Sequence, residues 1–218
     1  MLEKILHLFS PENQILLSKS LLNCHSKGVH YFVLHEYKDG RVLRMFLCEP
    51  DHELWKNNCE VTLSEPHELS VAIHPHHVDI EITPVFGYLW NLEFRKKKHH
   101  AFQKGQMKFK KFRWSSQIST GNGGFEYLGE QYLILEKFRM LHPDKKFKMK
   151  SNELHTVYVT KWQTAAWLVD EKPASSGYDS VNYSNADLTK WTPEGLYQKP
   201  LWEDIVEKMK LIGVNLKN

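Results

Sequence analysis

The chain has 218 residues, of which 41% are hydrophobic and 12% aromatic, enough apolar material to build the core of one domain and too much for a disordered chain. No apolar stretch approaches the roughly 20 residues of a membrane-spanning helix, and the first residues lack the basic start and apolar run of a secretory signal. Three widely spaced cysteines do not indicate a disulfide framework, so these features predict a cytoplasmic protein.

The formal net charge of +3 conceals a local asymmetry. Removing nine clustered basic residues from the 29 Lys and Arg leaves 20, against 26 Asp and Glu, so the rest of the chain is net negative by six. Residues 94–125, which hold this cluster, contain no Asp or Glu. A run of like charge of this kind raises the local concentration of anions. This basic run, within residues 94–125, comprises Arg95, Lys96, Lys97, Lys98, Lys104, Lys108, Lys110, Lys111 and Arg113.

The amino-terminal residues predict two short helical segments. Apolar residues recur at helical spacing over residues 2–9, and a second apolar face follows over residues 15–22. Ser10 resembles an N-cap, with Pro11 at the first helical position of the second segment. Gly28 marks the end of this helical lead.

From residue 29 the pattern changes to short runs rich in β-branched, aromatic and leucine residues. Two of them, at 29–36 and 42–48, flank a Lys-Asp-Gly turn and predict a hairpin. Many short strands at close spacing predict an antiparallel sandwich or barrel. The other runs lie at 69–73, 78–82, 85–91, 107–113, 131–139, 154–160 and 164–169, with a glycine-rich turn at 121–124.

The carboxy-terminal part predicts a polar connection followed by a helix. Residues 172–190 are rich in Ser, Asn, Asp and Pro, which is typical of a long surface connection. An apolar stripe over 201–212, stopped by Gly213, predicts an amphipathic helix. The chain therefore divides into a helical lead (1–28), a β-barrel with a basic insertion at 94–125 (29–171), and a carboxy-terminal extension (172–218).

The densest chemistry lies in the run from His74 to Glu81. Residues two apart on a strand point to the same face, so His74 and His76 can direct two imidazoles to one site. Glu81 can join them once a turn has changed the strand. Two or three imidazoles with one carboxylate suit Fe, Mn, Ni, Co or Zn and leave coordination positions open.

These residues carry a family resemblance. The run His74-x-His76-x-x-x-x-Glu81, followed by Gly87, resembles the first cupin motif, in which two histidines and a glutamate from adjacent strands bind a metal ion. The spacing to Gly87 is one residue shorter than the usual form of the family. Residues 150–159 resemble the second cupin motif, which supplies one more histidine, here His155.

Two departures from the second motif are present. Val159 stands where the family has asparagine, and 81 positions separate His74 from His155, an excess that the basic insertion explains. The resemblance implies a mostly-β fold, an antiparallel double-stranded β-helix or cupin jelly-roll barrel with helices at both ends. It also implies a divalent metal ion held by His74, His76, Glu81 and His155, and a homodimer formed through edge strands.

Other catalytic patterns are missing from the sequence. The three His-Glu pairs lack the second histidine of a zincin motif, and there is no G-x-S-x-G elbow and no phosphate-binding P-loop. Cysteine has no evident nucleophile setting. Covalent catalysis and nucleotide hydrolysis by a P-loop therefore have no candidate residues.

The first functional hypothesis is a metal-dependent cupin enzyme acting on a small polar or anionic molecule. The resemblance implies oxygenation first, with isomerisation or hydrolysis next, and Glu81 would complete the metal shell or act as a base. The alternative is a cupin-fold binding module for a nucleotide or other phosphorylated ligand, with Arg95, Lys111 and Arg113 as ligand-binding residues. A weaker third hypothesis is an oxygenase acting on nucleic acid or protein beside the basic run.

Overall fold

The structure is a computed structural model of the chain. It describes residues 2–24, 26–53, 73–96, 106–114, 125–172, 180–185, 187–190 and 195–216. The predicted turn at 121–124 and most of the predicted strand at 69–73 lie outside these ranges, as do Lys97, Lys98 and Lys104 of the basic run. Within them, no helix combines the length and the apolar character that crossing a bilayer demands.

The described residues are 49% strand and 15% helix, so the predicted mostly-β class is confirmed. The helices are η1 (Leu2–Leu8), α1 (Gln14–Lys19), η4 (Leu188–Lys190) and α2 (Trp202–Lys210). The strands are β1 (Val29–Glu36), β2 (Val42–Cys48), β3 (Ile80–Phe86), β4 (Leu89–Lys96), β5 (Gln106–Trp114), β6 (Phe125–Leu141), β7 (Phe147–Met149), β8 (Leu154–Tyr158), β9 (Ala165–Glu171) and β10 (Ser180–Ser184).

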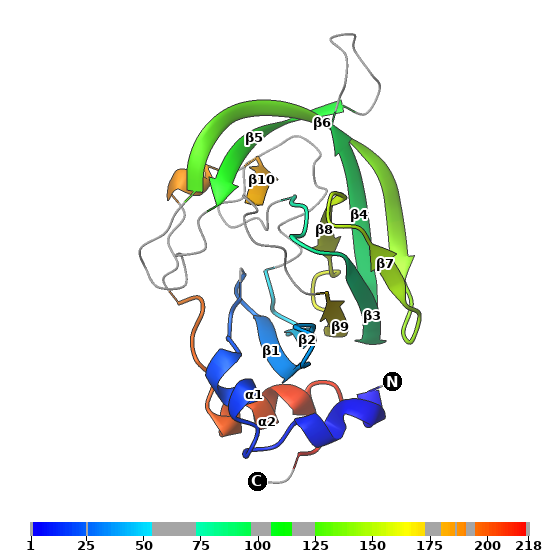
Figure 1. Cartoon of the computed structure of the whole chain (residues 1–218), viewed down its shortest axis with the longest axis vertical. Coiled ribbons are helices and arrows are strands. Elements are labelled where there is room, and N and C mark those ends of the chain that lie inside the picture. The colour runs from blue at the N-terminus through cyan, green and yellow to red at the C-terminus, as the bar shows by residue number, and fades with distance from the viewer. Residues whose placement is uncertain are drawn as a thin grey trace.

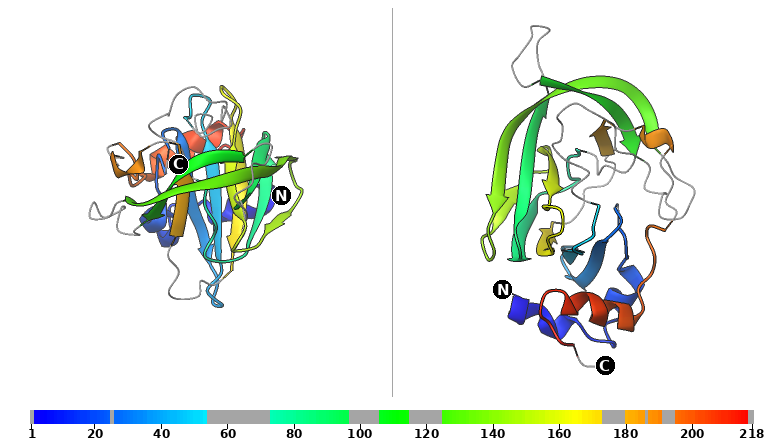
Figure 2. Two further views of the ribbon diagram at one scale, coloured as in Figure 1. Left: turned by 90° about the horizontal axis from the view of Figure 1, so that it is seen from above. Right: turned by 180° about the vertical axis from the view of Figure 1, so that it is seen from behind.

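The strands form two antiparallel sheets, an arrangement consistent with a cupin or jelly-roll sandwich. The first sheet has the order β1-β2-β9-β3-β7, and the second has the order β10-β5-β6-β4-β8. The predicted hairpin of β1 and β2 is confirmed. The second sheet is strongly curved, and β5 and β6 arch over β10 (Figures 1 and 2).

A two-residue segment connects the edge strands of the second sheet, β10 and β8. Ile73 exchanges both backbone hydrogen bonds with Tyr183 of β10, at N–O distances of 2.9 and 2.8 Å. His74 exchanges both with His155 of β8, each at 3.0 Å. The curled sheet therefore closes on itself through this segment, and the first predicted metal ligand is fixed by backbone pairing.

Strand β2 shows how the first sheet separates two apolar layers. Its residues alternate between faces because successive side chains of a strand point in opposite directions. Met45 and Leu47 pack against the helices on one face, whereas Phe46 and Cys48 belong to the core between the two sheets. Arg44 shares the face of Phe46, so β2 directs a cation into the layer between the sheets.

The two terminal helical regions cover the outer face of the first sheet, below β1 and β2 in Figure 1. In α2, Ile205 and Met209 are fully buried, and each such side chain stabilises the docking by roughly 1.5 to 3 kcal/mol. Gly213 follows α2 in the left-handed conformation, with φ of 76°, as the sequence predicted.

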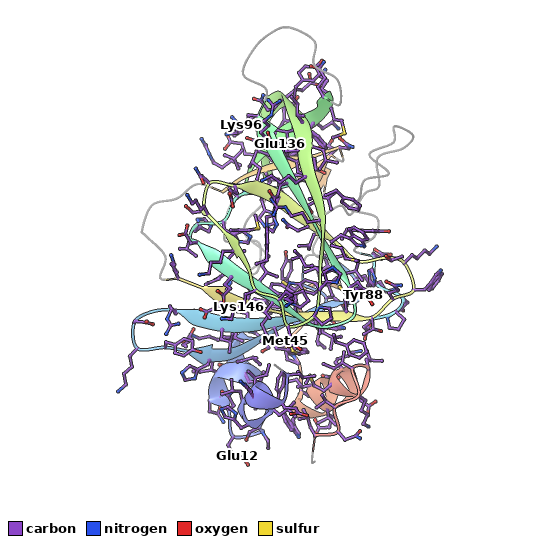
Figure 3. The ribbon with its side chains drawn as sticks, turned by 90° about the vertical axis from the view of Figure 1, so that its right-hand side faces the viewer. Glu12, Met45, Tyr88, Lys96, Glu136 and Lys146 are labelled. Carbon is purple, nitrogen blue, oxygen red and sulfur yellow. The ribbon has the colours of Figure 1, made fainter. Side chains whose placement is uncertain are left out.

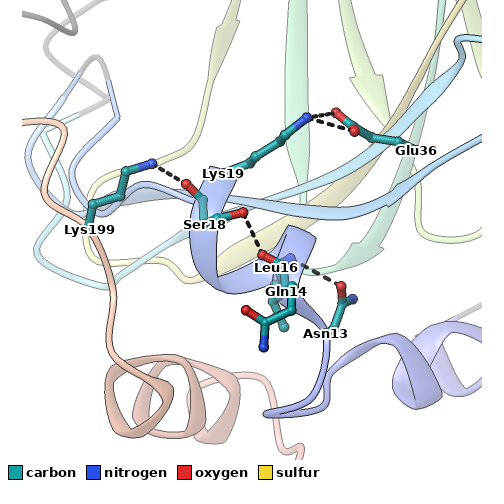
Figure 4. Close-up of polar contacts among 7 residues, drawn as sticks. All are labelled: Asn13, Gln14, Leu16, Ser18, Lys19, Glu36 and Lys199. Carbon is teal, nitrogen blue, oxygen red and sulfur yellow. Dashed lines mark hydrogen bonds and ion pairs between the residues drawn. The ribbon is translucent and has the colours of Figure 1, made fainter.

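The predicted start of the second helical segment is wrong, because α1 begins at Gln14 and its N-cap is Asn13. The Asn13 Oδ1 atom accepts a hydrogen bond from the backbone N–H of Leu16 at 3.2 Å (Figure 4). The amide of Asn13 also donates to two carbonyls, those of Leu8 and Leu34, at 2.8 and 3.1 Å. These three bonds favour Asn13 over Ser10 as the cap.

The predicted surface connection at 172–190 is wrong in its middle part. Residues 180–184 form β10, which pairs with β5, and Tyr183 is only 1% exposed. The polar neighbours Asn182 and Ser184 are also buried. Their polarity hid the strand, because the composition of the whole segment is that of a loop.

Candidate metal centre

The structure brings together three of the four predicted metal ligands, namely His74, His76 and His155. One ring nitrogen from each lies within 4.8 Å of the others. The ring centroids are 5.1 Å apart for His74 and His76, 5.3 Å for His74 and His155, and 4.8 Å for His76 and His155. Residues 79 positions apart in sequence thus share one site.

Backbone pairing explains how the histidines meet. His74 lies directly opposite His155 on β8, so the two imidazoles leave the sheet on the same face. Their neighbours Ile73 and Leu154 lie in the core enclosed by the second sheet, which directs the two histidines to the opposite side. His76 then follows Pro75 in the irregular segment that leads into β3.

The orientation of His155 is set by Asn91 on the adjacent strand β4. The His155 Nδ1 atom lies 2.7 Å from Asn91 Oδ1, and both residues are buried. Because an amide oxygen only accepts, Nδ1 carries the proton and Nε2 presents a lone pair. That Nε2 atom lies 2.7 Å from His76 Nε2, at the centre of the three-histidine group.

The surroundings keep two of the imidazoles neutral. Burial lowers the pKa of His155 well below its usual value, and the neighbouring His76 and His74 lower it further. Burial, together with the charges of His74 and Arg44, lowers the pKa of His76 to about 3. A neutral imidazole is the form that binds a metal ion, so His76 and His155 need no deprotonation at neutral pH.

The donor set fits a divalent transition metal. Three imidazoles suit Zn, Fe, Ni or Co, and three protein ligands leave positions open for a substrate. Two nitrogens bound to one ion at about 2.0–2.1 Å lie about 3 Å apart, which is near the 2.7 Å between the Nε2 atoms of His76 and His155. The hydrogen bond from His155 to Asn91 supplies the outer support that metal-bound histidines have.

The structure does not bring Glu81 into this group. Ile80 and Ile82 lie in the core between the sheets, so alternation along β3 directs Glu81 to the opposite face. There its Oε1 atom lies 2.5 Å from Nζ of Lys146, near the outer surface. The chain bends at residues 77–78, between His76 and Glu81, but β3 begins at Ile80, so Glu81 falls on the face of the strand that points away from the core between the sheets.

The basic residues proposed to bind a ligand lie on the arch of β4, β5 and β6, where acids of β6 face them. Arg95 is 2.7 Å from Glu136, and Arg113 is 3.0 Å from Glu126. Lys111 pairs through its backbone with Gly129 of β6 and Tyr183 of β10. In Figure 3, Glu136 lies at the far end of the molecule from Met45 of β2. Cross-strand acids therefore offset part of the predicted basic surface.

Sequence reasoning missed Asn91, Arg44 and Glu171. Asn91 and Arg44 each interrupt an apolar face of a strand, a signal that was present in the sequence. Which partners they meet was not readable, because the contacts join strands far apart in the chain. Glu171 is ion-paired with Arg44, with Oε2 2.6 Å from the Nη1 atom.

Known proteins resemble this chain in structure rather than in sequence. No family model matches the chain, and no curated relative matches. Solved structures that resemble it include hydroxypropylphosphonic acid epoxidase from S. wedmorenis, with 9% identity and a TM-score of 0.36 over 71% of this chain and 56% of that one. The chain thus spans little more than half of the epoxidase.

Two further structures align at similar levels. The polyketide cyclase RemF from Streptomyces resistomycificus has 13% identity and a TM-score of 0.35, with 87% of each chain covered. An HTH_3 family transcriptional regulator from Vibrio cholerae has 12% identity and a TM-score of 0.36, covering 76% of this chain and 62% of that one. Likeness at this level assigns no function, so the functional argument rests on the site.

Proposed function

We propose that this chain is a metal-dependent enzyme of the cupin type acting on a small polar or anionic molecule. The observation that carries the proposal is the three-histidine group, with one ring nitrogen of each residue within 4.8 Å of the others. A divalent ion bound there, Fe, Mn, Ni or Zn, would supply Lewis-acid or redox chemistry. Oxygenation is the first expected reaction, with isomerisation or hydrolysis next.

The residues of the chain would divide the work as follows. His74, His76 and His155 would hold the ion, and three ligands leave room for substrate oxygens. Asn91 would keep the proton of His155 on Nδ1, so that Nε2 stays available. Burial of His155, which is 3% exposed, keeps bulk water from its ring.

The alternative, a binding module for a nucleotide or other phosphorylated ligand, is less well supported. That hypothesis was based on the basic run of residues 94–125. Three cations of this run, Arg95, Lys108 and Arg113, form ion pairs with acids of β6, which offset part of the positive charge that would attract a phosphate. The three-histidine group would have no role in a metal-free module. We therefore retain the metal enzyme as the first hypothesis.

Elemental analysis of tag-free protein tests this proposal. We expect close to one equivalent of a transition metal per chain after purification or reloading, and a large loss in His76→Ala and His155→Ala. His142→Ala is the matched control, because His142 is exposed and lies outside the three-histidine group. Protein that takes up none of Fe, Mn, Ni or Zn would contradict the proposal.

A further inference from the structure

Glu93 of β4 is the direct strand partner of His155, one of the three histidines of the candidate metal centre. It follows Asn91 by two residues, so the side chains of Glu93 and Asn91 point to the same face of the strand. The Glu93 side chain is only 13% exposed. A carboxylate at such a depth costs free energy unless opposite charges and hydrogen bonds compensate it.

Lys137, Arg139 and Asn91 contact this carboxylate. From β6, Nζ of Lys137 lies 3.0 Å from Oε2, and Nε of Arg139 lies 3.1 Å from Oε1. From β4, Nδ2 of Asn91 donates a hydrogen bond to Oε1 at 3.4 Å. Both cations are exposed, whereas Asn91 is fully buried. Glu93 is therefore held between cations on the solvent side and an amide on the interior side.

The amide of Asn91 joins Glu93 to the histidine. Its Nδ2 atom faces the carboxylate, and its Oδ1 atom lies 2.7 Å from Nδ1 of His155. Because Asn91 is fully buried, bulk water does not compete for either contact. A continuous chain of hydrogen bonds thus runs from Glu93 through Asn91 to His155, across two paired strands.

An asparagine amide has two orientations, related by a half-turn of its planar end group, in which oxygen and nitrogen exchange places. The contact with His155 alone does not choose between them, because an imidazole nitrogen donates in one tautomer and accepts in the other. A carboxylate only accepts, so Glu93 selects the orientation in which Nδ2 of Asn91 faces it. That orientation leaves Oδ1 for His155 and places the imidazole proton on Nδ1.

We propose that Glu93 is a positioning residue of the metal centre, which fixes the amide of Asn91 and thereby the tautomer of His155. The Nε2 atom of His155, which lies 2.7 Å from Nε2 of His76, then keeps its lone pair for an ion. The negative charge also polarises the amide, which strengthens the hydrogen bond from Nδ1–H and makes Nε2 a better ligand. The effect on the tautomer concerns the chain alone, whereas the effect on metal affinity rests on the proposed function.

The test measures the tautomer of His155 in the full chain, freed of metal with a chelator. Histidine labelled with ¹⁵N gives separate NMR signals for protonated and unprotonated ring nitrogens, and His155→Ala identifies the signals of His155 by their loss. Glu93→Gln removes the charge and brings a donor to position 93. Glu93→Ala, which removes the acceptor without adding a donor, serves the same purpose if Glu93→Gln does not fold.

A double variant separates positioning from a general structural role. Asn91→Asp combined with Glu93→Gln exchanges the amide and the carboxylate, and a carboxylate at position 91 accepts from Nδ1–H in either orientation. Glu136→Gln is the matched control, because Glu136 pairs with Arg95 between the same two strands, at 2.7 Å.

We expect His155 to be protonated on Nδ1 alone in the unmodified protein and in Glu136→Gln. Either single variant at Glu93 should show both tautomers, and the double variant should return His155 to Nδ1–H. The affinity for Zn²⁺, from competition with a chelator, should fall about 10-fold in the single variants and recover in the double variant.

Three results would overturn the role of Glu93: protonation of Nε2 in the unmodified protein, pure Nδ1–H in the single variants, or no return to Nδ1–H in the double variant. The expected tautomers in a chain that takes up no Zn²⁺ would instead contradict the proposed function and leave the positioning of His155 by Glu93 in place.

Discussion

The Nδ1 atom of His155 lies 2.7 Å from Oδ1 of Asn91, and this contact fixes the tautomer of a histidine at the centre of the candidate metal site. The two residues belong to β8 and β4, which pair directly in the second sheet. The sheet therefore provides both a candidate metal ligand and its support.

Replacing Asn91 with alanine should weaken metal binding without removing a ligand. The variant leaves Nδ1–H of His155 buried and unpaired, and loss of such a support lowers metal affinity by about 10- to 100-fold. Competition titration of Zn²⁺ against a chelator measures the change, with Asn215→Ala as the control at an exposed position. An Asn91→Ala affinity within twofold of the unmodified protein would show that Asn91 does not support the site.

Replacing Glu81 with glutamine should leave the metal content unchanged, because Glu81 lies on the other face of β3 from the core between the sheets. Only its ion pair with Lys146 is lost, which costs about 0 to 1 kcal/mol of unfolding free energy. Metal analysis of this variant beside His155→Ala separates the two positions. A Glu81→Gln protein as poor in metal as His155→Ala would restore Glu81 as a ligand.

Gly87 should resist substitution strongly. Its φ is +66°, and a Cβ atom there would lie 2.3 Å from the carbonyl oxygen of Thr164, so Gly87→Ala combines backbone strain with a clash. We expect a loss of about 3 kcal/mol or more in unfolding free energy, from urea denaturation. Gly195→Ala is the matched control, since its φ is +72° and nothing lies within 4 Å, and should cost about 1 to 2 kcal/mol. Equal losses would mean that the Thr164 contact is not decisive.

Glu49 should make the stability depend on pH under acid conditions. The contact of the Glu49 carboxylate with His30, whose Nε2 atom lies 3.1 Å from Oε1, is the largest cause that lowers the pKa of Glu49 to about 2, and Lys208 contributes. Because the folded pKa lies below the ordinary value of 4.5, this carboxylate stabilises the fold above about pH 4.5. That contribution is lost as the pH falls from 4.5 toward 2.

Unfolding free energies of Glu49→Gln measure this effect. The variant should be less stable at pH 7 by about 1 to 2 kcal/mol, a value reduced for partial solvent screening, and the deficit should vanish near pH 2. Glu207→Gln, at a surface ion pair with Lys210, should show little deficit at either pH. A Glu49→Gln deficit that stays constant from pH 7 to pH 2 would rule out the proposed linkage.

Much of the fold and the three histidines of the candidate site could be predicted from the sequence. Period-two runs located the hairpin of β1 and β2, and the His-x-His spacing pointed to His74 and His76. His155 was identified from a motif resemblance alone, and the structure places it beside them. Each of these signals is local, which is why a single sequence carried them.

The remainder depended on long-range pairing. Asn91 is 64 positions from His155, and Arg44 meets Glu171 across two neighbouring strands that are distant in the chain. Glu81 was predicted to lie with the histidines, but the face of β3 to which it points depends on where that strand begins. The histidine-rich segment does not reveal that position. The basic run looked uncompensated because its acidic partners lie in β6, beyond the stretch that was counted.

Anomalous diffraction at the cobalt edge, from crystals grown with Co²⁺, tests the central claim most directly. We predict one strong peak about 2.0–2.1 Å from the Nε2 atoms of His76 and His155 and at the same distance from a ring nitrogen of His74. A peak held by Glu81 or by other residues, or no peak among the three histidines, would contradict the account.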